Sequence, residues 1–237
     1  MLYLRKLVSI RKYFILFFTI FFISCGGNKN TGINLVYIFD ISGSYYQGSL
    51  RPSVKLAENI FTDITSTEGL PYYPQTHQVS TIEEMSVAIG GLCATKIKEG
   101  NIFEEQSYNP KDQFDACLQK VMNASMARST DIRGALLTAS KSLQNKELYG
   151  RGVIIFSDMQ EVINERRQYD IDLSGIPVYV IYEWSKQQLQ NPSMQRNDRQ
   201  YLESLLDQAG CPSYSFKPLT SVITDPDMVR KFFRRKF

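Results

Sequence analysis

The sequence predicts a single α/β domain with a doubly wound, largely parallel sheet and helices on both faces. Its 237 residues suit one domain of the larger kind and leave little room for a second. Several apolar runs are nearly continuous, as in strands that are buried on both faces of a parallel sheet. Segments with helical spacing of apolar residues lie between these runs, and strands that alternate with helices imply this architecture.

The predicted strands comprise three clear apolar runs and one weaker region. The first run, residues 33–39 (INLVYIF), ends at Asp40. The second, residues 153–156, ends at Ser157 and Asp158, and the third, residues 176–182 (IPVYVIY), ends at Glu183 and Trp184. Residues 77–95 are expected to hold one or two strands at a sheet edge.

The predicted helices follow from apolar residues at helical spacing and from their end signals. One follows Pro52 and a second covers residues 114–122. A third covers residues 132–143, and a fourth covers residues 202–209 and ends at Gly210. The last begins at Asp225 and Pro226, a capping residue and a first-turn proline. Residues 96–112 and 185–199 are polar and typical of surface loops.

The N-terminal residues have the layout of a secretory signal. Four basic residues and no acid lie in residues 1–24, and the apolar run over residues 13–23 is too short for the ~20 residues that span a bilayer. Residues 22–27 (FISCGG) resemble the lipobox of bacterial lipoproteins, in which the Cys becomes the lipidated first residue. We therefore predict a signal peptide over residues 1–24, a lipidated Cys25 with a linker over residues 25–32, and a domain over residues 33–237.

This resemblance implies a lipid-anchored protein on a membrane surface of the bacterial envelope, either periplasmic or surface-exposed. Seven residues follow Cys25 before the first strand and reach about 23 Å when extended, so the domain would lie close to its membrane. The alternative is a buried Cys25 in an uncleaved anchor. Of the other cysteines, Cys93, Cys117 and Cys211 show no metal-like spacing, so one disulfide can form and none is required.

The charge distribution excludes nucleic acid as the expected partner. The chain has 27 Lys plus Arg against 24 Asp plus Glu, a formal charge of +3. Four of these cations lie in the predicted signal and five lie in residues 230–237, so the body between them is acidic. The basic tail, which contains Phe232, Phe233 and Phe237, either lies on an anionic membrane or docks on the sheet through its phenylalanines, and docking is favoured.

The first strand is followed by oxygen-bearing side chains at alternate positions. Asp40, Ser42 and Ser44 flank Gly43, which can bend the chain sharply. Oxygen atoms at this spacing can converge on a hard cation such as Mg²⁺, Ca²⁺ or Mn²⁺. Taken alone, the pattern more often belongs to a turn or to the cap of the following helix than to a metal site.

The pattern resembles the metal-ion-dependent adhesion site of von Willebrand factor A-type domains over about residues 33–237. Asp40-x-Ser42-x-Ser44 matches the first motif, Thr130 precedes a helix with Gly, Ala and Leu, and Asp158 follows the strand VIIFS. One departure is Met159, where the family usually has glycine. The resemblance implies one divalent cation, with Mg²⁺ preferred over Ca²⁺ or Mn²⁺, held by these five residues. It also implies a protein partner that supplies an acidic side chain to the cation.

The predicted topology offers a physical reason for this grouping. In a sheet of order 3-2-1-4-5-6 the first and fourth strands are neighbours, and their connections leave toward opposite faces. A crevice therefore opens at their carboxyl ends, where Asp40 and Asp158 would meet.

Other residues have two interpretations each. Glu183 and Trp184 follow the next strand and could form the rim of a partner-binding face, but Trp184 could equally cover the core. Tyr45 and Tyr46 could face a partner or pack under the first helix. His77 is expected to lie in a polar loop, and we assign it no role.

Three functions compete at this level. The leading hypothesis is a non-enzymatic, cation-dependent protein-binding module that is anchored to the envelope membrane. The alternatives are a metal-dependent phosphoester hydrolase, with Asp40 and Asp158 at the reaction centre, and a structural scaffold with an idle metal site. The hydrolase is disfavoured because Ser42 stands where haloacid-dehalogenase-type phosphatases have a second Asp, and no Gly-x-Ser-x-Gly elbow occurs.

Overall fold

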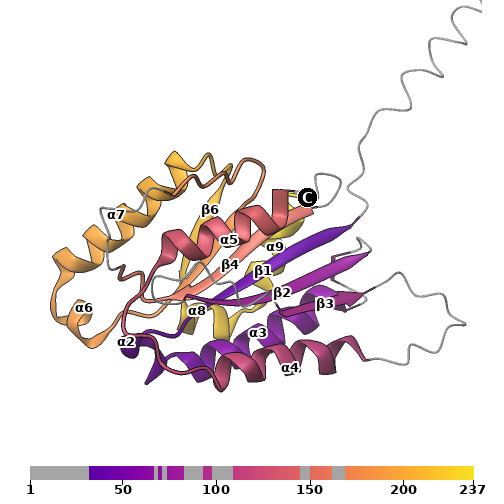
Figure 1. Ribbon diagram of the computed structural model, residues 1–237, viewed down its shortest axis with the longest axis horizontal. Coiled ribbons are helices and arrows are strands. Elements are labelled where there is room, and N and C mark those ends of the chain that lie inside the picture. Colours follow the sequence, from indigo (N-terminus) through magenta and orange to yellow (C-terminus); the bar gives the residue numbers. More distant parts are fainter. Residues whose placement is uncertain are drawn as a thin grey trace, which may run out of the picture.

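A six-stranded sheet with the order β3-β2-β1-β4-β5-β6 forms the centre of the protein (Figure 1). This computed structural model describes residues 32–66, 69–70, 74–82, 93–97, 109–144, 150–161 and 169–237. All neighbouring strands are parallel except β2 and β3, which are antiparallel. The strands are β1 (Ile33–Asp40), β2 (Gln75–Ile82), β3 (Cys93–Ile97), β4 (Gly150–Ser157), β5 (Val178–Tyr182) and β6 (Tyr214–Pro218). The predicted fold class and the adjacency of the first and fourth strands are confirmed.

Helices cover both faces of the sheet. They are α2 (Gly43–Tyr46), α3 (Leu50–Thr65), α4 (Pro110–Met122), α5 (Ile132–Gln144), α6 (Lys186–Gln190), α7 (Pro192–Gln208), α8 (Leu219–Thr224) and α9 (Asp227–Arg234). Side chains of β1 alternate between two buried clusters, because successive strand residues point to opposite faces. Leu35, Tyr37 and Phe39 pack with α3, α4, α8 and α9, whereas Val36 and Ile38 pack with α5 and α7. Every residue of β1 is buried, as its continuous apolar sequence predicts.

The C-terminal helix α9 is docked on the sheet through its phenylalanines. Phe233 is fully buried, Phe237 stacks on it with ring centroids 5.5 Å apart, and Phe232 meets Tyr179 edge-on. Of the two interpretations of this tail, docking is the one that the structure supports. The cations Arg234, Arg235 and Lys236 remain exposed at its end.

The predicted loop over residues 185–199 is wrong, because α6 and most of the first half of α7 occupy it. The sequence signal for these helices is polar: Ser185 and Gln188 form a capping box, and Pro192 stands in the first turn of α7. Residues 96–97 end β3 and residues 110–112 begin α4, so the loop predicted over residues 96–112 is too long at both ends; residues 98–108 lie outside the described part. The strand β6 was not predicted.

The predicted signal peptide, the predicted lipidation of Cys25 and the linker lie outside the described residues, apart from Gly32. Within the ranges that the structure describes, no helix combines the length and the apolar character needed to cross a membrane.

His77 does not lie in a polar loop as predicted but is fully buried in β2. One ring nitrogen lies 3.1 Å from the hydroxyl of Tyr37 and the other 3.1 Å from Oε1 of Gln75. Phe61 and Phe114 surround the ring, with centroids 4.8 and 6.1 Å away. Strands were expected in residues 77–95, but the polar sequence of β2 (QTHQVSTI) hid the burial of His77, which Tyr37 and Gln75 make possible by bonding its two ring nitrogens.

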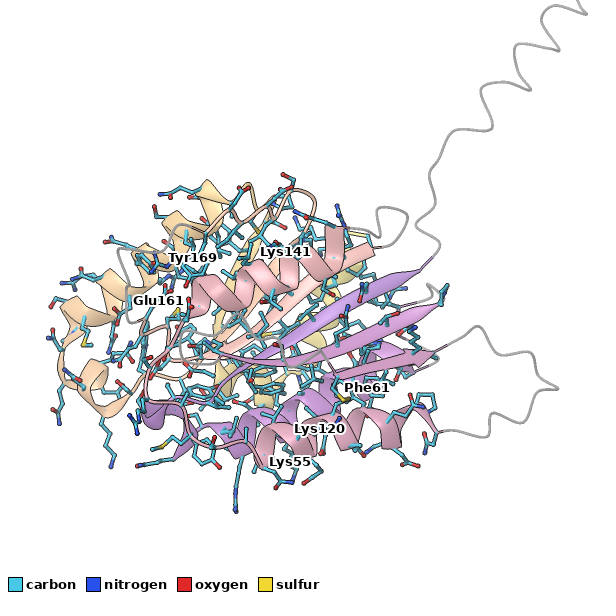
Figure 2. The ribbon with its side chains drawn as sticks, in the orientation of Figure 1. Lys55, Phe61, Lys120, Lys141, Glu161 and Tyr169 are labelled. Atoms are coloured by element: carbon cyan, nitrogen blue, oxygen red, sulfur yellow. A yellow bond between two sulfur atoms is a disulfide. The ribbon has the colours of Figure 1, made fainter. Side chains whose placement is uncertain are left out.

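A disulfide joins Cys93 of the edge strand β3 to Cys117 of α4, which settles a question that the sequence left open (Figure 2). The two residues are 24 positions apart. The bond lowers the conformational entropy of the unfolded chain and thereby raises the free energy of unfolding by about 3 kcal/mol. We expect Cys117→Ser to lower the free energy of unfolding in urea by about that amount. Cys211→Ser is the control, since Cys211 is free; equal losses in the two variants would contradict the prediction.

Candidate metal centre

Asp40 ends β1 and is completely buried. Its Oδ1 accepts a hydrogen bond from the backbone N–H of Ser42 at 2.8 Å, and its Oδ2 accepts one from the hydroxyl of Ser157 at 2.7 Å. The pairing of Phe39 with Phe156 in the β1–β4 register sets Asp40 beside Ser157. The strand pairing therefore fixes the carboxylate beside the carboxyl end of β4, as the topology predicted.

Asp158 follows β4 directly and is 1% exposed. The hydroxyl of Ser44 donates to its Oδ2 at 2.6 Å, and the backbone N–H of Gln160 donates to its Oδ1 at 3.0 Å. The hydroxyl oxygens of Ser44 and Ser42 lie 3.5 Å apart. Ser42 stands at the N-cap position of the short helix α2 without a side-chain capping bond, and the first turn of α2 holds Ser44. Four of the five predicted ligands, Asp40, Ser42, Ser44 and Asp158, are thus joined in one hydrogen-bonded cluster.

Thr130, the fifth predicted ligand, is 4% exposed and precedes α5. Its segment is held at both ends against the two acidic segments. On one side the N–H of Ala127 donates to the carbonyl of Ile41 at 2.9 Å. On the other, the N–H of Arg133 donates to Glu161 at 3.1 Å. These two bonds hold the Thr130 segment against the residues that follow Asp40 and Asp158, although no hydrogen bond of the Thr130 hydroxyl is described.

The electrostatics of the cluster favour a bound cation. Burial, and secondly the charge of Asp158, raises the pKa of Asp40 to about 7. Burial also raises the pKa of Asp158, while the Ser44 hydroxyl lowers it. Among the described residues, neither carboxylate has an ion pair with Lys or Arg. Two buried like charges without a counter-charge are unstable in the ionised state, and a cation between them removes this cost.

The donor set fits a hard divalent cation. In the part of the chain that the structure describes, no group of three or more His, Cys, Asp or Glu side chains could hold a metal. The centre instead offers two carboxylates and up to three hydroxyls, all oxygen atoms, which suit Mg²⁺, Ca²⁺ or Mn²⁺ rather than a softer ion. Asp40 and Asp158 would supply the charge, and Ser42, Ser44 and Thr130 would supply neutral ligands.

Met159, where the resembling family usually has glycine, has a φ of 64°. This left-handed conformation favours glycine and costs another residue about 1–2 kcal/mol. The Met159 side chain is fully buried, and its N–H donates to the Ser157 hydroxyl at 2.9 Å. The turn after Asp158 therefore keeps the backbone conformation that a glycine permits, and packing of the Met side chain offsets the strain.

Sequence reasoning missed three residues that support the cluster. Ser157 bonds Asp40, as described above, and Gln160 donates its N–H to Asp158 and its side-chain amide to Ser185 at 3.0 Å. The buried Gln188 donates to the carbonyl oxygen of Asp158 and to Asp198, both at 2.8 Å. The capping-box spacing of Ser185 and Gln188 was the only sequence signal for this support.

The predicted partner-binding rim is partly wrong. Tyr45 is 1% exposed and its hydroxyl bonds Ser53 at 2.6 Å, so it packs beneath α3 and cannot face a partner. Glu183 and Trp184 are half-buried and line a groove beside Ser44. Trp184 also packs on Tyr182, with ring centroids 4.8 Å apart, so it covers the core and borders the surface at once.

No protein-family model and no curated protein sequence matches the chain. Among solved structures it resembles a von Willebrand factor type A protein from Catenulispora acidiphila, with 12% identity over 86% of this chain and 42% of that one and a TM-score of 0.47. The hypothetical protein BatB from Bacteroides thetaiotaomicron gives 12% identity, 86% and 97% coverage and a TM-score of 0.47. Proximal thread matrix protein 1 from the mussel byssus, described with a zinc-occupied MIDAS motif, gives 14% identity, 86% and 46% coverage and a TM-score of 0.47.

The chain thus spans less than half the length of two of these three proteins. At such identities and TM-scores below 0.5, the function of this chain has to be argued from its own residues.

Glu161 is a further residue that positions the predicted ligands (Figure 2). Its side chain is 1% exposed, and its Oε1 accepts from both the N–H and Nε of Arg133, each at 3.1 Å. Arg133 also lies over the ring of Tyr169, whose hydroxyl donates to Asp131 at 2.6 Å. These bonds tie the segment of Thr130 to the segment that follows Asp158.

We expect Glu161→Gln to weaken Mg²⁺ binding about tenfold, the lower end of the range for residues that orient metal ligands. The amide keeps one acceptor oxygen but loses the charge that holds Arg133. Isothermal titration calorimetry with Mg²⁺ measures the change. Glu203→Gln removes a comparable contact to Arg199 on the exposed surface of α7 and is expected to leave the affinity unchanged. Equal affinities of Glu161→Gln and the unaltered chain would refute the positioning role.

Proposed function

We propose that this chain is a divalent-cation-dependent protein-binding module, anchored by a lipidated Cys25 to a membrane of the bacterial envelope. The observation that carries the proposal is the pair of buried carboxylates Asp40 and Asp158, bridged to serine hydroxyls and without a basic partner among the described residues. All donors are hard oxygens, which fit Mg²⁺, Ca²⁺ or Mn²⁺, and we take Mg²⁺ as the ion that the resemblance to the metal-ion-dependent adhesion site implies.

The binding step follows from charge. Two carboxylates balance a divalent ion without excess negative charge, so a carboxylate from a partner protein is not repelled. In a water-poor setting such a carboxylate–metal bond adds a strong directional contact to an otherwise ordinary interface.

The arrangement of the chain supports a site that points away from the membrane. The linker from Cys25 enters β1 at Ile33, and the carboxylate cluster lies at the other end of this strand, at Asp40, seven residues or ~23 Å farther on. The C-terminus lies at the same end as Ile33, because Ile33 pairs with Gly150 and Phe237 packs against Gly150 (Figure 1). The disulfide between Cys93 and Cys117 supports an oxidising compartment outside the cytoplasm.

Capture of partner proteins from envelope extracts by the full chain in detergent tests the proposal. We expect one or more proteins to be retained in Mg²⁺ and released by EDTA, and Asp158→Ala to retain none, because the cation and its acidic ligand are both required. Asp112→Ala, which removes an exposed carboxylate on α4, is the matched control. Capture that neither EDTA nor Asp158→Ala affects would favour the scaffold hypothesis and overturn the proposal.

A further inference from the structure

A groove of about 730 Å³ runs from the candidate metal centre across the surface between α2, α6 and α8. Gly43 and Ser44 form its end at the metal centre, so one of its walls belongs to a predicted ligand. Trp184 follows β5 into the same groove, and Leu219 of α8 lines it from the other side. A volume of this size is typical of pockets that hold a drug-sized ligand, so the groove can take up a few side chains.

The exposed apolar side chains of the protein gather at this groove. Among the described residues, only Met126, Leu189 and Ile223 are large hydrophobic residues with high exposure, at 49%, 62% and 50%. Leu189 and Ile223 both line the groove, although they come from α6 and α8, which are far apart in the sequence. Met126 lies outside it, next to Gly43. Exposed apolar residues that cluster beside polar ones mark interaction sites.

The rest of the lining suits a peptide backbone. Gln47 and Gln187 present amides that can donate to and accept from main-chain groups, whereas the Gln160 amide is already bonded to the Ser185 hydroxyl. The charged residues Glu183 and Lys186 offset each other, so the lining itself attracts neither sign of charge. The cation at the Ser44 end would therefore set the charge of the occupant.

We propose that the groove binds an extended segment of a partner protein in which an acidic residue is followed or preceded, within a few positions, by bulky apolar residues. The carboxylate of this acidic residue binds the cation at the Ser44 end of the groove, and the apolar side chains contact Leu189, Ile223 and Trp184. This inference rests on the proposed function, because the acid has no counterpart without the cation. It goes beyond that function by naming the surface and the kind of segment that it selects.

Panning of phage-displayed random 12-residue peptides on the immobilised full chain in detergent tests the inference. Clones are bound in Mg²⁺ and eluted with EDTA. We expect the eluted peptides to combine Asp or Glu with nearby Leu, Ile, Phe or Trp. Synthetic versions of these peptides should bind the double variant Leu189→Ser/Ile223→Ser about tenfold more weakly than they bind the unaltered chain. A loss of this size is typical of removing apolar anchors. Both residues are exposed, so the variant is expected to fold.

Met126→Ser is the matched control, because Met126 is similarly exposed and close to the metal centre but not in the groove. It should bind the peptides as the unaltered chain does. Calorimetry with Mg²⁺ alone is run on the unaltered chain and on every variant. If the unaltered chain does not bind Mg²⁺, the proposed function itself is overturned. If Mg²⁺ binding is intact, three results would overturn only this inference. These are no EDTA-eluted clones, clones that lack Asp and Glu, or peptides that bind the double variant Leu189→Ser/Ile223→Ser as tightly as the unaltered chain. If the unaltered chain self-associates and Leu189→Ser/Ile223→Ser does not, the groove binds a second copy of the chain. That result would also overturn the inference.

Discussion

Asp40→Asn is expected to abolish the stabilisation of the protein by Mg²⁺ and to make the cation-free protein more stable at neutral pH. Burial and the charge of Asp158 raise the pKa of Asp40 to about 7, so the ionised carboxylate destabilises the cation-free fold. Asparagine removes this charge and keeps the contacts: its Oδ1 still accepts from the N–H of Ser42, and its amide can donate to the hydroxyl of Ser157. The same change removes half of the negative charge that attracts the cation.

The size of the effect follows from mass action. A cation at 100 times its dissociation constant stabilises the folded chain by about 2.7 kcal/mol. For a domain of this size that amounts to roughly 5–10 °C in the melting temperature. Melting curves in Mg²⁺ and in EDTA at pH 7.5 should show this difference for the unaltered chain and none for Asp40→Asn.

Asp112→Asn is the control for this experiment, since Asp112 is an exposed carboxylate on α4. It should respond to Mg²⁺ as the unaltered chain does. If Asp40→Asn were stabilised by Mg²⁺ to the same extent as the unaltered chain, the candidate metal centre would be wrong. A cation-free Asp40→Asn that melts below the unaltered chain would show that the charge of Asp40 does not destabilise the fold.

The sequence predicted the centre because its residues follow buried strands. The apolar runs before Asp40 and Asp158 indicate parallel strands, and parallel strands bring their carboxyl ends to one edge. Motif spacing then added the serines, which the structure joins to the two acids. The supports of the centre could not be found in this way, because Gln188 and Glu161 act through long-range bonds from polar segments.

The groove was equally invisible in the sequence. Leu189 and Ile223 stand alone in polar surroundings in the sequence, and only the fold, which sets α6 and α8 along one groove, brings them together. Polar segments are ambiguous for the same reason. Residues 185–199 lack the apolar stripe of an amphipathic helix, so α6 and the start of α7 depend on caps and side-chain bonds that composition alone does not reveal.

His77 is expected to make the protein sensitive to mild acid. It is the only histidine in the chain, and it is fully buried in β2. Gln75 Oε1 can only accept, so the nearby ring nitrogen of His77 donates to it and the other ring nitrogen accepts from the hydroxyl of Tyr37. The neutral ring therefore satisfies all of its hydrogen bonds in the folded state.

Burial lowers the pKa of His77 to about 3 in the folded protein, while the unfolded chain binds a proton near pH 6.5. The folded state is therefore fully favoured above pH 6.5 and loses stability as the pH falls toward 3. The loss is about 1.4 kcal/mol per pH unit, or roughly 2 kcal/mol between pH 6.5 and 5. Asp40 and Glu161, whose pKa values are raised, act in the opposite direction, because the folded state binds their protons more tightly.

His77→Gln separates these contributions, because it keeps a polar side chain in the same pocket and does not titrate. Urea unfolding at pH 7, 6 and 5 should show that the free-energy difference between the unaltered chain and His77→Gln shifts by roughly 2 kcal/mol in favour of the variant on acidification. The carboxylates are common to both proteins and cancel in this difference. A difference that stays constant from pH 7 to 5 would mean that the ring is protonated as readily in the folded chain as in the unfolded one, and that its burial imposes no barrier to charge.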